Sequence, residues 1–202
     1  MNDGFGGASR TNHITLYTDA YTVRGRLESN HRRLTDALNE AVDGFLVLAD
    51  VTFDEFRSAS NLIRADYAQV NLASVLFVTS EDDVASDPAL AAPRTSEEAF
   101  ISVPPFKIIG RIHLEVDRPL RAALAELRGR FVPVTQAAHW SDSLAEARTT
   151  VPYLAVNHAR CQILAPHQEV DPWAGLSATP SETAQPGEPG YVPPPATEPT
   201  GW

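Results

Sequence analysis

Four arginines near the start of the sequence are the residues best suited to binding an anion. Arg24 and Arg26 alternate within a strand-like segment, and Arg32 and Arg33 follow directly after His31. The simpler interpretation of this set is a surface that compensates the many acidic side chains of the chain. The alternative is a local patch for an anion, an RNA segment or an acidic protein partner, because clustered positive charge attracts such ligands.

Catalytic and metal-binding motifs are missing from the rest of the sequence. The six histidines show neither HxxxH nor HExxH spacing, which recognisable zinc sites use. No G-x-S-x-G elbow and no phosphate-binding glycine loop occurs. The carboxylate pairs Asp82-Asp83 and Glu97-Glu98 fall in a charged linker, where solvation explains them. We therefore predict a protein that is not an enzyme and that holds no metal and no cofactor.

Isolated aromatic residues in the C-terminal tail form the second candidate site. After Pro166 the composition changes to Pro, Gly, Thr, Ser and Glu, so residues 168–202 are expected to be a disordered, Pro-rich tail. Aromatic residues in such a segment are typical of short recognition motifs, because an extended backbone loses little entropy on docking. Alternatively, Trp173 folds back onto its own domain. The residues predicted to bind a protein are Trp173, Leu176, Tyr191 and Trp202.

A segment that occurs twice organises the elements that would position these residues. Residues 21–27 read YTVRGRL, and residues 106–112 read FKIIGRI. At nearly the same offset, YAQVN at 67–71 is matched by YLAVN at 153–157. Matches in this order indicate a tandem duplication of one small domain.

Each copy is expected to be mainly β with one short inserted helix, an α+β arrangement. Alternating apolar residues predict a strand over 21–28, and helical spacing of leucines and alanines predicts helices over 33–42 and 118–127. Gly25 and Gly110, inside strands, predict a bend, a bulge or a close backbone approach. We therefore predict two tandem small β-barrel-like repeats.

The boundaries of these parts follow from the repeat and from changes in composition. Segments 53–66 and 139–150 lack a clear period and are expected to be variable loops. The predicted parts are a flexible leader over 1–12, the first repeat over 13–80, an acidic linker over 81–98, the second repeat over 99–167 and the tail over 168–202.

Three local features refine the prediction. Phe45–Val51 is a nearly continuous apolar run and predicts the most buried strand of its unit. The corresponding segment contains Pro133, which predicts a local edge because proline lacks the N–H group that a sheet ladder needs. Asn71 and Asn157 precede short connections, where asparagine suits an Asx-type turn or a positive φ.

Overall composition limits the classes of function. The net charge of −10, from 26 acidic and 16 basic side chains, disfavours broad binding to phosphate backbones but leaves a local patch open. The single Cys161 excludes an intramolecular disulfide and, in the place of Val75, is expected to be a small buried residue. We see no signal peptide and no apolar run near the ~20 residues of a membrane span, so we predict a cytoplasmic protein without membrane insertion.

The order of elements resembles a family. A glycine-containing strand, a short Leu-rich helix, an apolar strand and a Val-Asn phrase before a closing strand look like an uncharacterised bacterial small β domain of unknown function, with Tyr21–Leu27 and Val156-Asn157 as landmarks. The layout is also loosely similar to Sm-like small barrels, which bind RNA or assemble into rings. Here, however, the helix lies after the second strand, so no RNA-binding residue is carried over. The resemblance covers 13–80 and 99–165 and implies a fold, not an activity.

We predict a non-enzymatic cytoplasmic interaction or adaptor protein, in which the tandem domains form a docking surface and the tail supplies a tethered motif. A protein partner is expected, and a homo-oligomer is compatible with this reading. The first alternative is a nucleic-acid (RNA) binding module that uses the arginine patch. The second is a small-ligand or enzymatic site between the two repeats, lined by Tyr67, Asn71, Tyr153 and Asn157.

Overall fold

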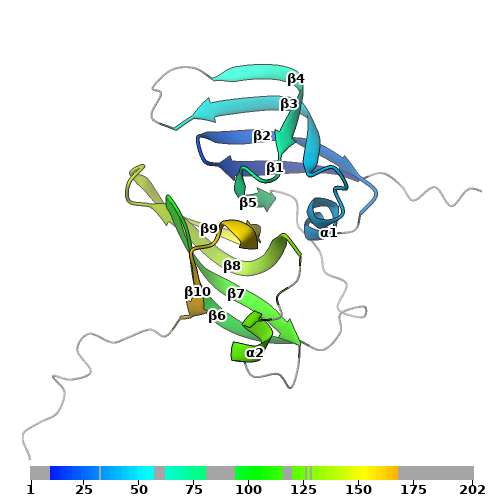
Figure 1. Ribbon diagram of the computed structural model, residues 1–202. Coiled ribbons are helices and arrows are strands. Elements are labelled where there is room, and N and C mark those ends of the chain that lie inside the picture. The colour runs from blue at the N-terminus through cyan, green and yellow to red at the C-terminus, as the bar shows by residue number, and fades with distance from the viewer. Residues whose placement is uncertain are drawn as a thin grey trace, which may run out of the picture. The chain divides into compact units, whose positions relative to one another are not determined.

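Long antiparallel strands account for most of the structure. The computed structural model describes residues 10–31, 33–56, 62–80, 94–115, 120–125, 127 and 129–167. These residues form a ten-stranded sheet with the order β10-β6-β7-β8-β9-β5-β1-β2-β3-β4, which can be followed in Figure 1. The prediction of a mainly β protein is confirmed. The tail predicted over 168–202 lies outside the described residues.

The first half of the sheet consists of two strands, a short helix and three further strands. Strands β1 (Arg10–Thr18) and β2 (Tyr21–Ser29) form a hairpin. The Thr18 hydroxyl stabilises its turn by accepting hydrogen bonds from the N–H groups of Ala20 and Tyr21 at 3.3 and 2.9 Å. The remaining elements are α1 (Leu34–Asn39), β3 (Phe45–Glu55), β4 (Ile63–Asn71) and β5 (Val75–Ser80).

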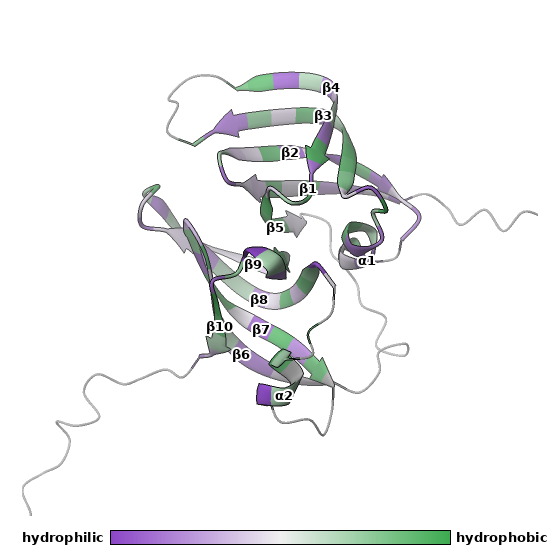
Figure 2. Cartoon of the chain, in the orientation of Figure 1, coloured by the Kyte–Doolittle hydropathy of each residue, from purple (hydrophilic) through white to green (hydrophobic). Residues whose placement is uncertain are grey.

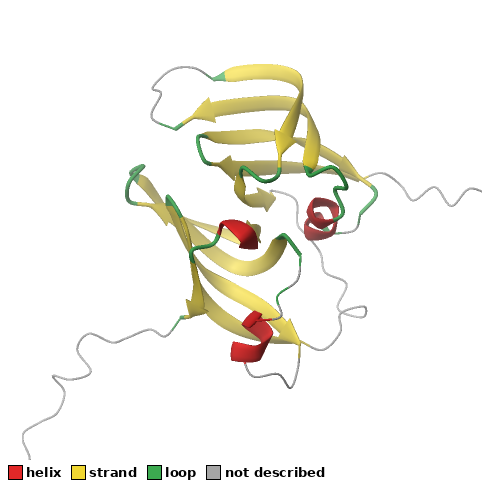
Figure 3. Cartoon of the chain, viewed as in Figure 1, coloured by secondary structure: helices red, strands yellow, loops and turns green. Residues whose placement is uncertain are grey.

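The second half follows the same succession and has the same internal strand order, 5-1-2-3-4. A short 3-10 helix, η2 (His158–Arg160), precedes its last strand, and the helices of both halves are short (Figure 3). The elements are β6 (Arg94–Val103), β7 (Phe106–Glu115), α2 (Leu120–Ala125), β8 (Phe131–Ser141), β9 (Glu146–Asn157) and β10 (Ile163–Pro166).

Several expected boundaries are wrong by a few residues. Strand β1 begins at Arg10, within the expected leader, and β6 begins at Arg94, so the linker ends before 98 and contains neither Glu97 nor Glu98. Segment 139–150 consists largely of strands rather than a loop, and residues 53–55 and 63–66 of the other segment also lie in strands. Their period was hidden because these ends of the hairpins are mostly exposed, as Arg148, Thr149 and Thr150 are.

Positions in the two halves can be paired by their place in the sheet. We call two residues matching when they lie 85 apart in the first two strands of each half, or 86 apart from the helices onward. The pairing supports this definition: Ile14 lies opposite Ser80, and Ala99 lies opposite Pro166. The side chains of Asn71 and Asn157 also match, since each accepts a hydrogen bond from the N–H two residues later. The predicted Asx-type turns are confirmed.

Both halves contain a β-bulge at the same place. Asp50 and Gln136, which match, have φ of 51° and 49°, a left-handed conformation unusual for residues other than glycine. Opposite them, the register shifts between Arg24 and Arg26 and between Ile109 and Arg111, so Gly25 and Gly110 each face two residues. The bulges predicted from the two glycines are confirmed.

Strand β8 is central yet locally an edge. It pairs with β9 from Phe131 onward, but its pairing with β7 reaches only Val134. Pro133 therefore lies beyond the β7 ladder, where the missing N–H costs nothing. The prediction of a local edge at this proline is confirmed.

The two halves share their cores. One apolar cluster combines Leu16, Leu38 and Leu72 of the first half with Phe131 and Ala155 of the second. The other consists mainly of residues from the second half, but it includes Leu76 and Phe77 of the first. Green and purple stripes along the strands in Figure 2 show the alternation that supplies these buried faces. Each half thus completes the other's core.

The halves join where β5 pairs with β9. Three residue pairs, Phe77–Val156, Val78–Ala155 and Thr79–Leu154, make this antiparallel ladder, which we call the internal junction. The Asn39 side chain also bonds both backbone groups of Phe131, accepting from N–H at 2.8 Å and donating to C=O at 3.0 Å.

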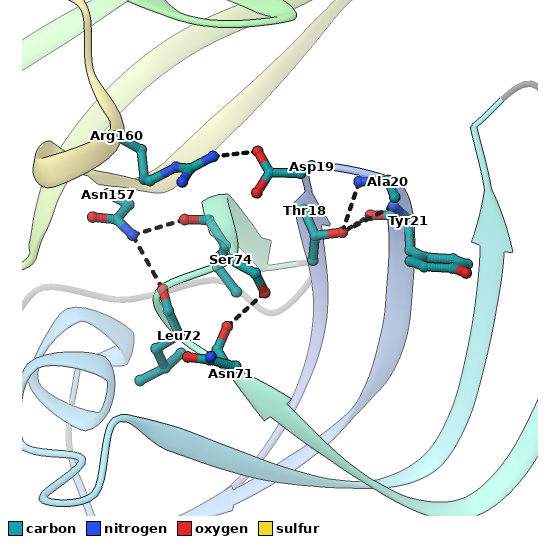
Figure 4. Close-up of polar contacts among 10 residues, drawn as sticks. Thr18, Asp19, Ala20, Tyr21, Asn71, Leu72, Ser74, Asn157 and Arg160 are labelled. Atoms are coloured by element: carbon teal, nitrogen blue, oxygen red, sulfur yellow. Dashed lines mark hydrogen bonds and ion pairs between the residues drawn. The ribbon is translucent and has the colours of Figure 1, made fainter.

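Polar side chains complete the internal junction (Figure 4). The buried Asn157 amide donates to the carbonyl oxygens of Leu72 and Val75 at 3.1 and 2.7 Å. Beside it, the Arg160 guanidinium forms an ion pair with Asp19. This ion pair is partly exposed, so we expect the Asn157 hydrogen bonds to contribute more to stability.

Candidate docking surface

Three apolar side chains are exposed on one face of β3 and β4. Phe45, Val47 and Tyr67 have exposed fractions of 44%, 60% and 73%. Phe45 lies opposite Asn71, Val47 opposite Gln69 and Ala49 opposite Tyr67, so all three side chains leave the sheet on the same side. Leu46 and Leu48 between them are buried. We call Phe45, Val47 and Tyr67, with the last residues of β4 (68–71), the β3–β4 surface.

This surface corrects the prediction that Phe45–Val51 is the most buried strand of its unit. The strand does bury Leu46, Leu48 and Val51, but its other face is open. An apolar residue at every position suggested burial on both faces. The charged residues Arg64 and Asp66 in the following strand were a sign in the sequence, because edge strands often carry charges.

Strand β4 is an edge of the sheet among the described residues. It pairs with β3 only, and β10 at the other end pairs with β6 only. An unpaired edge presents a row of N–H and C=O groups to a further strand. The charged Arg64 and Asp66 lie toward the start of β4, whereas its last residues before Asn71 are Ala68, Gln69 and Val70.

An open hollow of about 380 Å³ lies beside this surface. Its apolar lining includes Ala37, Ala41 and Phe45, and its polar lining includes Glu28 and Glu40. Glu40 also lies 3.7 Å from the Nδ1 atom of His31. The hollow thus continues the apolar face of Phe45 toward α1, with acidic groups beside it.

The arginines proposed as an anion patch have different neighbours. Arg26 forms an ion pair with Asp50 at 2.8 Å and lies 3.8 Å from Glu28. Burial raises the pKa of Glu146 above its ordinary value, and the positive charge of the exposed Arg24 offsets part of this rise.

Arg33 approaches β9 at a different point, beside Tyr153, seven residues further along the strand than Glu146. Burial raises the pKa of Tyr153 to about 12, and Thr35 beside its hydroxyl group moderates the rise. At about 3.3 Å per residue the two positions lie roughly 20 Å apart along the strand. Arg32 lies outside the described residues. Anion or nucleic-acid binding stays a prediction.

The four residues proposed for a site between the repeats do not form one common site. Asn157 on β9 donates to the carbonyl of Leu72, the residue after Asn71 at the end of β4, so the two asparagines are neighbours. Tyr67 on β4 is 73% exposed, however, whereas Tyr153 on β9 packs against an apolar core cluster. The Asn157 side chain is committed to the internal junction. The tail residues Trp173, Leu176, Tyr191 and Trp202 lie outside the described residues, so their predicted role stays a prediction.

Two potentially reactive side chains, those of His139 and Cys161, lie in surroundings that suppress their reactivity. His139 is 2% exposed among Tyr17, Phe77 and Phe106, and burial lowers its pKa. Neither ring nitrogen of His139 has a hydrogen-bond partner among the described residues. Burial raises the pKa of Cys161 to about 11, which leaves the thiol protonated at neutral pH.

Within the described ranges, the chain shows neither a metal-binding cluster nor a membrane-spanning helix. No three His, Cys, Asp or Glu side chains there gather closely enough to bind a metal ion. Within the same ranges, no helix has the length and apolar character needed to cross a membrane. Comparison with protein-family models, curated proteins and solved structures gives no match. The resemblance to a bacterial small β domain and to Sm-like barrels therefore stays untested.

Proposed function

We propose that this chain is a non-enzymatic interaction protein that docks another protein on the β3–β4 surface. The observation that carries the proposal is the exposure of Phe45, Val47 and Tyr67 side by side, next to a strand edge with no neighbour among the described residues. Scattered apolar side chains are ordinary on protein surfaces, but a contiguous set beside an open edge is typical of an interface.

The occupant that fits this surface is an extended, mainly apolar segment. Such a segment can add a strand to β4, where backbone hydrogen bonds supply affinity and alternate side chains supply specificity. Its apolar side chains would cover Phe45 and Tyr67. The uncharged stretch Ala68–Val70 suits this docking better than the part of β4 that carries Arg64 and Asp66.

The proposal includes the origin of the two halves and the role of the tail. The common element order, the matching bulges and the matching asparagine turns support a tandem duplication of one small β domain. Residues 168–202 would act as a tethered recognition segment, which the composition of the tail supports.

A peptide-display experiment tests the docking surface. The full chain is panned against a library of displayed random twelve-residue peptides, and the selected peptides are measured against the Tyr67→Lys and Ile63→Lys variants. Ile63 is a matched control because it lies on the same strand and is 49% exposed. We expect Tyr67→Lys to weaken binding by about tenfold or more, since it places a charge in the apolar contact. Equal binding to both variants would contradict the proposal.

A second experiment addresses the tail. Pull-downs from native lysate compare the full chain with a chain truncated after Gln168, each with and without nuclease. Partners that disappear with the tail and ignore nuclease support the tethered motif. Partners that survive truncation and disappear with nuclease would instead favour nucleic-acid binding by the arginines.

A further inference from the structure

We propose that the partner at the β3–β4 surface is a second copy of this chain, which binds through the end formed by β10, η2 and α2. Strand β10 of one copy would pair with β4 of the next, and the two sheets would become continuous. This inference rests on the proposed function, because it names the occupant of the same surface.

The internal junction supplies the template for this contact. There, the last strand of the first half, β5, pairs with the fourth strand of the second half, β9. The matching strands are β10 and β4, and these are the two unpaired edges of the described sheet. The two edge strands of the molecule, β10 and β4, therefore match the two strands that already pair with each other at the internal junction.

The template also predicts the register. Phe77–Val156, Val78–Ala155 and Thr79–Leu154 at the internal junction correspond to three pairs between copies. In this register the pairing ends at Ala165, one residue before Pro166, as the internal ladder ends at Thr79. The expected pairs are Ile163 with Val70, Leu164 with Gln69 and Ala165 with Ala68.

The exposed apolar side chains are those that the template would bury. Ile163 is 53% exposed, and its match Phe77 is 0% exposed at the internal junction. Tyr21 and Phe45 are 40% and 44% exposed, whereas the residues that match them are 1% exposed. These matching residues are Phe106 and Phe131.

A hollow next to β10 fits one of these side chains. Its volume is about 250 Å³, and its lining includes Leu124, His158, Cys161 and Leu164. The residues that match this lining are Leu38, Leu72, Val75 and Val78, which share one buried cluster with Phe131. Because Phe45 matches Phe131, the template brings Phe45 of a second copy to this hollow.

Polar groups agree with the same contact. Asn157 donates to the carbonyls of Leu72 and Val75, so Asn71 of a second copy would reach the matching carbonyls of His158 and Cys161. The charged Arg64 and Asp66 match Thr150 and Pro152, which lie outside the paired stretch of β9. They therefore do not obstruct the expected pairing.

The contact between copies is weaker than the internal junction. Ala125 stands where Asn39 binds both backbone groups of Phe131, and no side-chain amide replaces it. The ion pair of Arg160 with Asp19 is also lost, because Ser74 and Pro104 match them. Association should therefore be reversible and depend on concentration. Since the contact joins unlike ends, species larger than dimers should appear as the concentration rises.

Sedimentation equilibrium of the full chain tests the inference. Wild-type protein should shift from the 21.9 kDa monomer toward multiples of it as the concentration rises. Ile163→Lys should weaken association about tenfold or more, and Ile63→Lys should leave it within about twofold. The two isoleucines have nearly equal exposure, 53% and 49%, but Ile63 matches the exposed Thr149. A monomer at every concentration, or equal effects of both variants, would overturn the inference.

A gain-of-function variant separates assembly from loss of folding. Ala125→Asn restores the missing amide, and Asp43→Gly removes the side chain at the position that matches Gly129, where an added Cβ would lie 3.1 Å from Asn39 Nδ2. The double variant should associate about tenfold more tightly than Asp43→Gly alone, as expected for two added hydrogen bonds. An unchanged association constant would count against the register.

Mixed disulfides distinguish the two proposals. In a Cys161→Val background, Ala68→Cys and Ala165→Cys chains should form a mixed dimer under oxidation, because facing residues in a ladder lie within disulfide reach. Failure to cross-link, with peptide binding still dependent on Tyr67, would refute self-association and leave the proposed function standing. Cross-linking without any Tyr67-dependent peptide would refute docking of other proteins and leave self-association standing.

Discussion

Asn157 donates its side-chain amide to the carbonyl oxygen of Val75 at 2.7 Å, across the contact between the two halves of the chain. The same amide reaches the carbonyl of Leu72 at 3.1 Å, and its oxygen accepts from the N–H of Ala159. Asn157 is 1% exposed, so water cannot replace these bonds without local opening. One side chain therefore ties the turn before β5 to the turn after β9.

Substitution of Asn157 by Ala should destabilise the protein by about 2–4 kcal/mol, because buried carbonyl groups lose their donors. The free energy of unfolding in urea measures this. Asn71→Ala is the matched control, since Asn71 holds the same place in the first half but is exposed and lacks the two cross-half bonds. We expect the control to lose about 1 kcal/mol or less. Similar losses in both variants would contradict the role given to Asn157.

His139 should make stability depend on pH. Burial lowers its pKa in the folded protein from the ordinary 6.5. Below pH 6.5 the unfolded chain therefore binds a proton that the folded protein binds less readily, and the free energy of unfolding falls as the pH falls. Above that pH this histidine contributes no pH dependence.

His139→Phe should remove this contribution. The matching residue in the first half is Phe53, so the position accepts a phenylalanine ring. The variant should gain about 1 kcal/mol near neutral pH, since two buried nitrogens without partners disappear. Urea unfolding between pH 5 and pH 8 should show its advantage over wild type growing below pH 6.5. A constant advantage would mean that His139 does not titrate differently on folding.

The two bulge glycines should differ in their tolerance of alanine. A Cβ atom at Gly110 would lie 2.7 Å from Val134 Cγ1 and 3.0 Å from the Ala137 backbone. At Gly25 the closest atom would be the Leu48 Cβ, at 3.1 Å. Gly110→Ala should therefore cost about 2–4 kcal/mol of unfolding free energy, and Gly25→Ala should cost less. The reverse order in thermal or urea unfolding would contradict the reported geometry.

Cys161 should react slowly with thiol reagents. Its pKa of about 11 leaves very little thiolate at pH 7.5, and thiolate is the reactive form. Alkylation by iodoacetamide should be at least tenfold slower than that of a cysteine in unfolded chain, for which urea-denatured protein is the control. The rate should rise steadily from pH 7 to pH 10 without reaching a plateau. A rate that levels off between pH 9 and pH 10 would indicate an ordinary thiol, whose pKa is about 8.5.

The conformational preferences of single residues predicted the parts of the fold that depend on residues close together in the sequence. Gly25 and Gly110 marked the bulges, Asn71 and Asn157 marked the turns, and Pro133 marked a local edge, because each has a conformational property that few other residues share. The repeated sequence segments also predicted matching strands. These predictions needed no knowledge of which strand meets which.

The parts that sequence could not predict depend on contacts between distant strands. Phe45 and Phe131 match and are chemically identical, yet one is 44% exposed and the other 1% exposed. Their exposure differs because β9, beside Phe131, pairs with β5, whereas β4, beside Phe45, remains an edge. For the same reason the β3–β4 surface escaped prediction: its residues look like core, and in the second half the corresponding phenylalanine is core.

The sharing of the two cores also constrains how this sequence can change over generations. A substitution at Phe77 or Phe131 alters a cluster to which both halves contribute, so selection on one half acts on the other. Sequence differences between the halves should then be best tolerated at positions outside both cores. The exposed parts of β4 and β9 fit this pattern, with Arg64 and Asp66 in one half against Thr150 and Pro152 in the other. If the halves arose as two equal copies, neither half would now have a complete core when separated from the other.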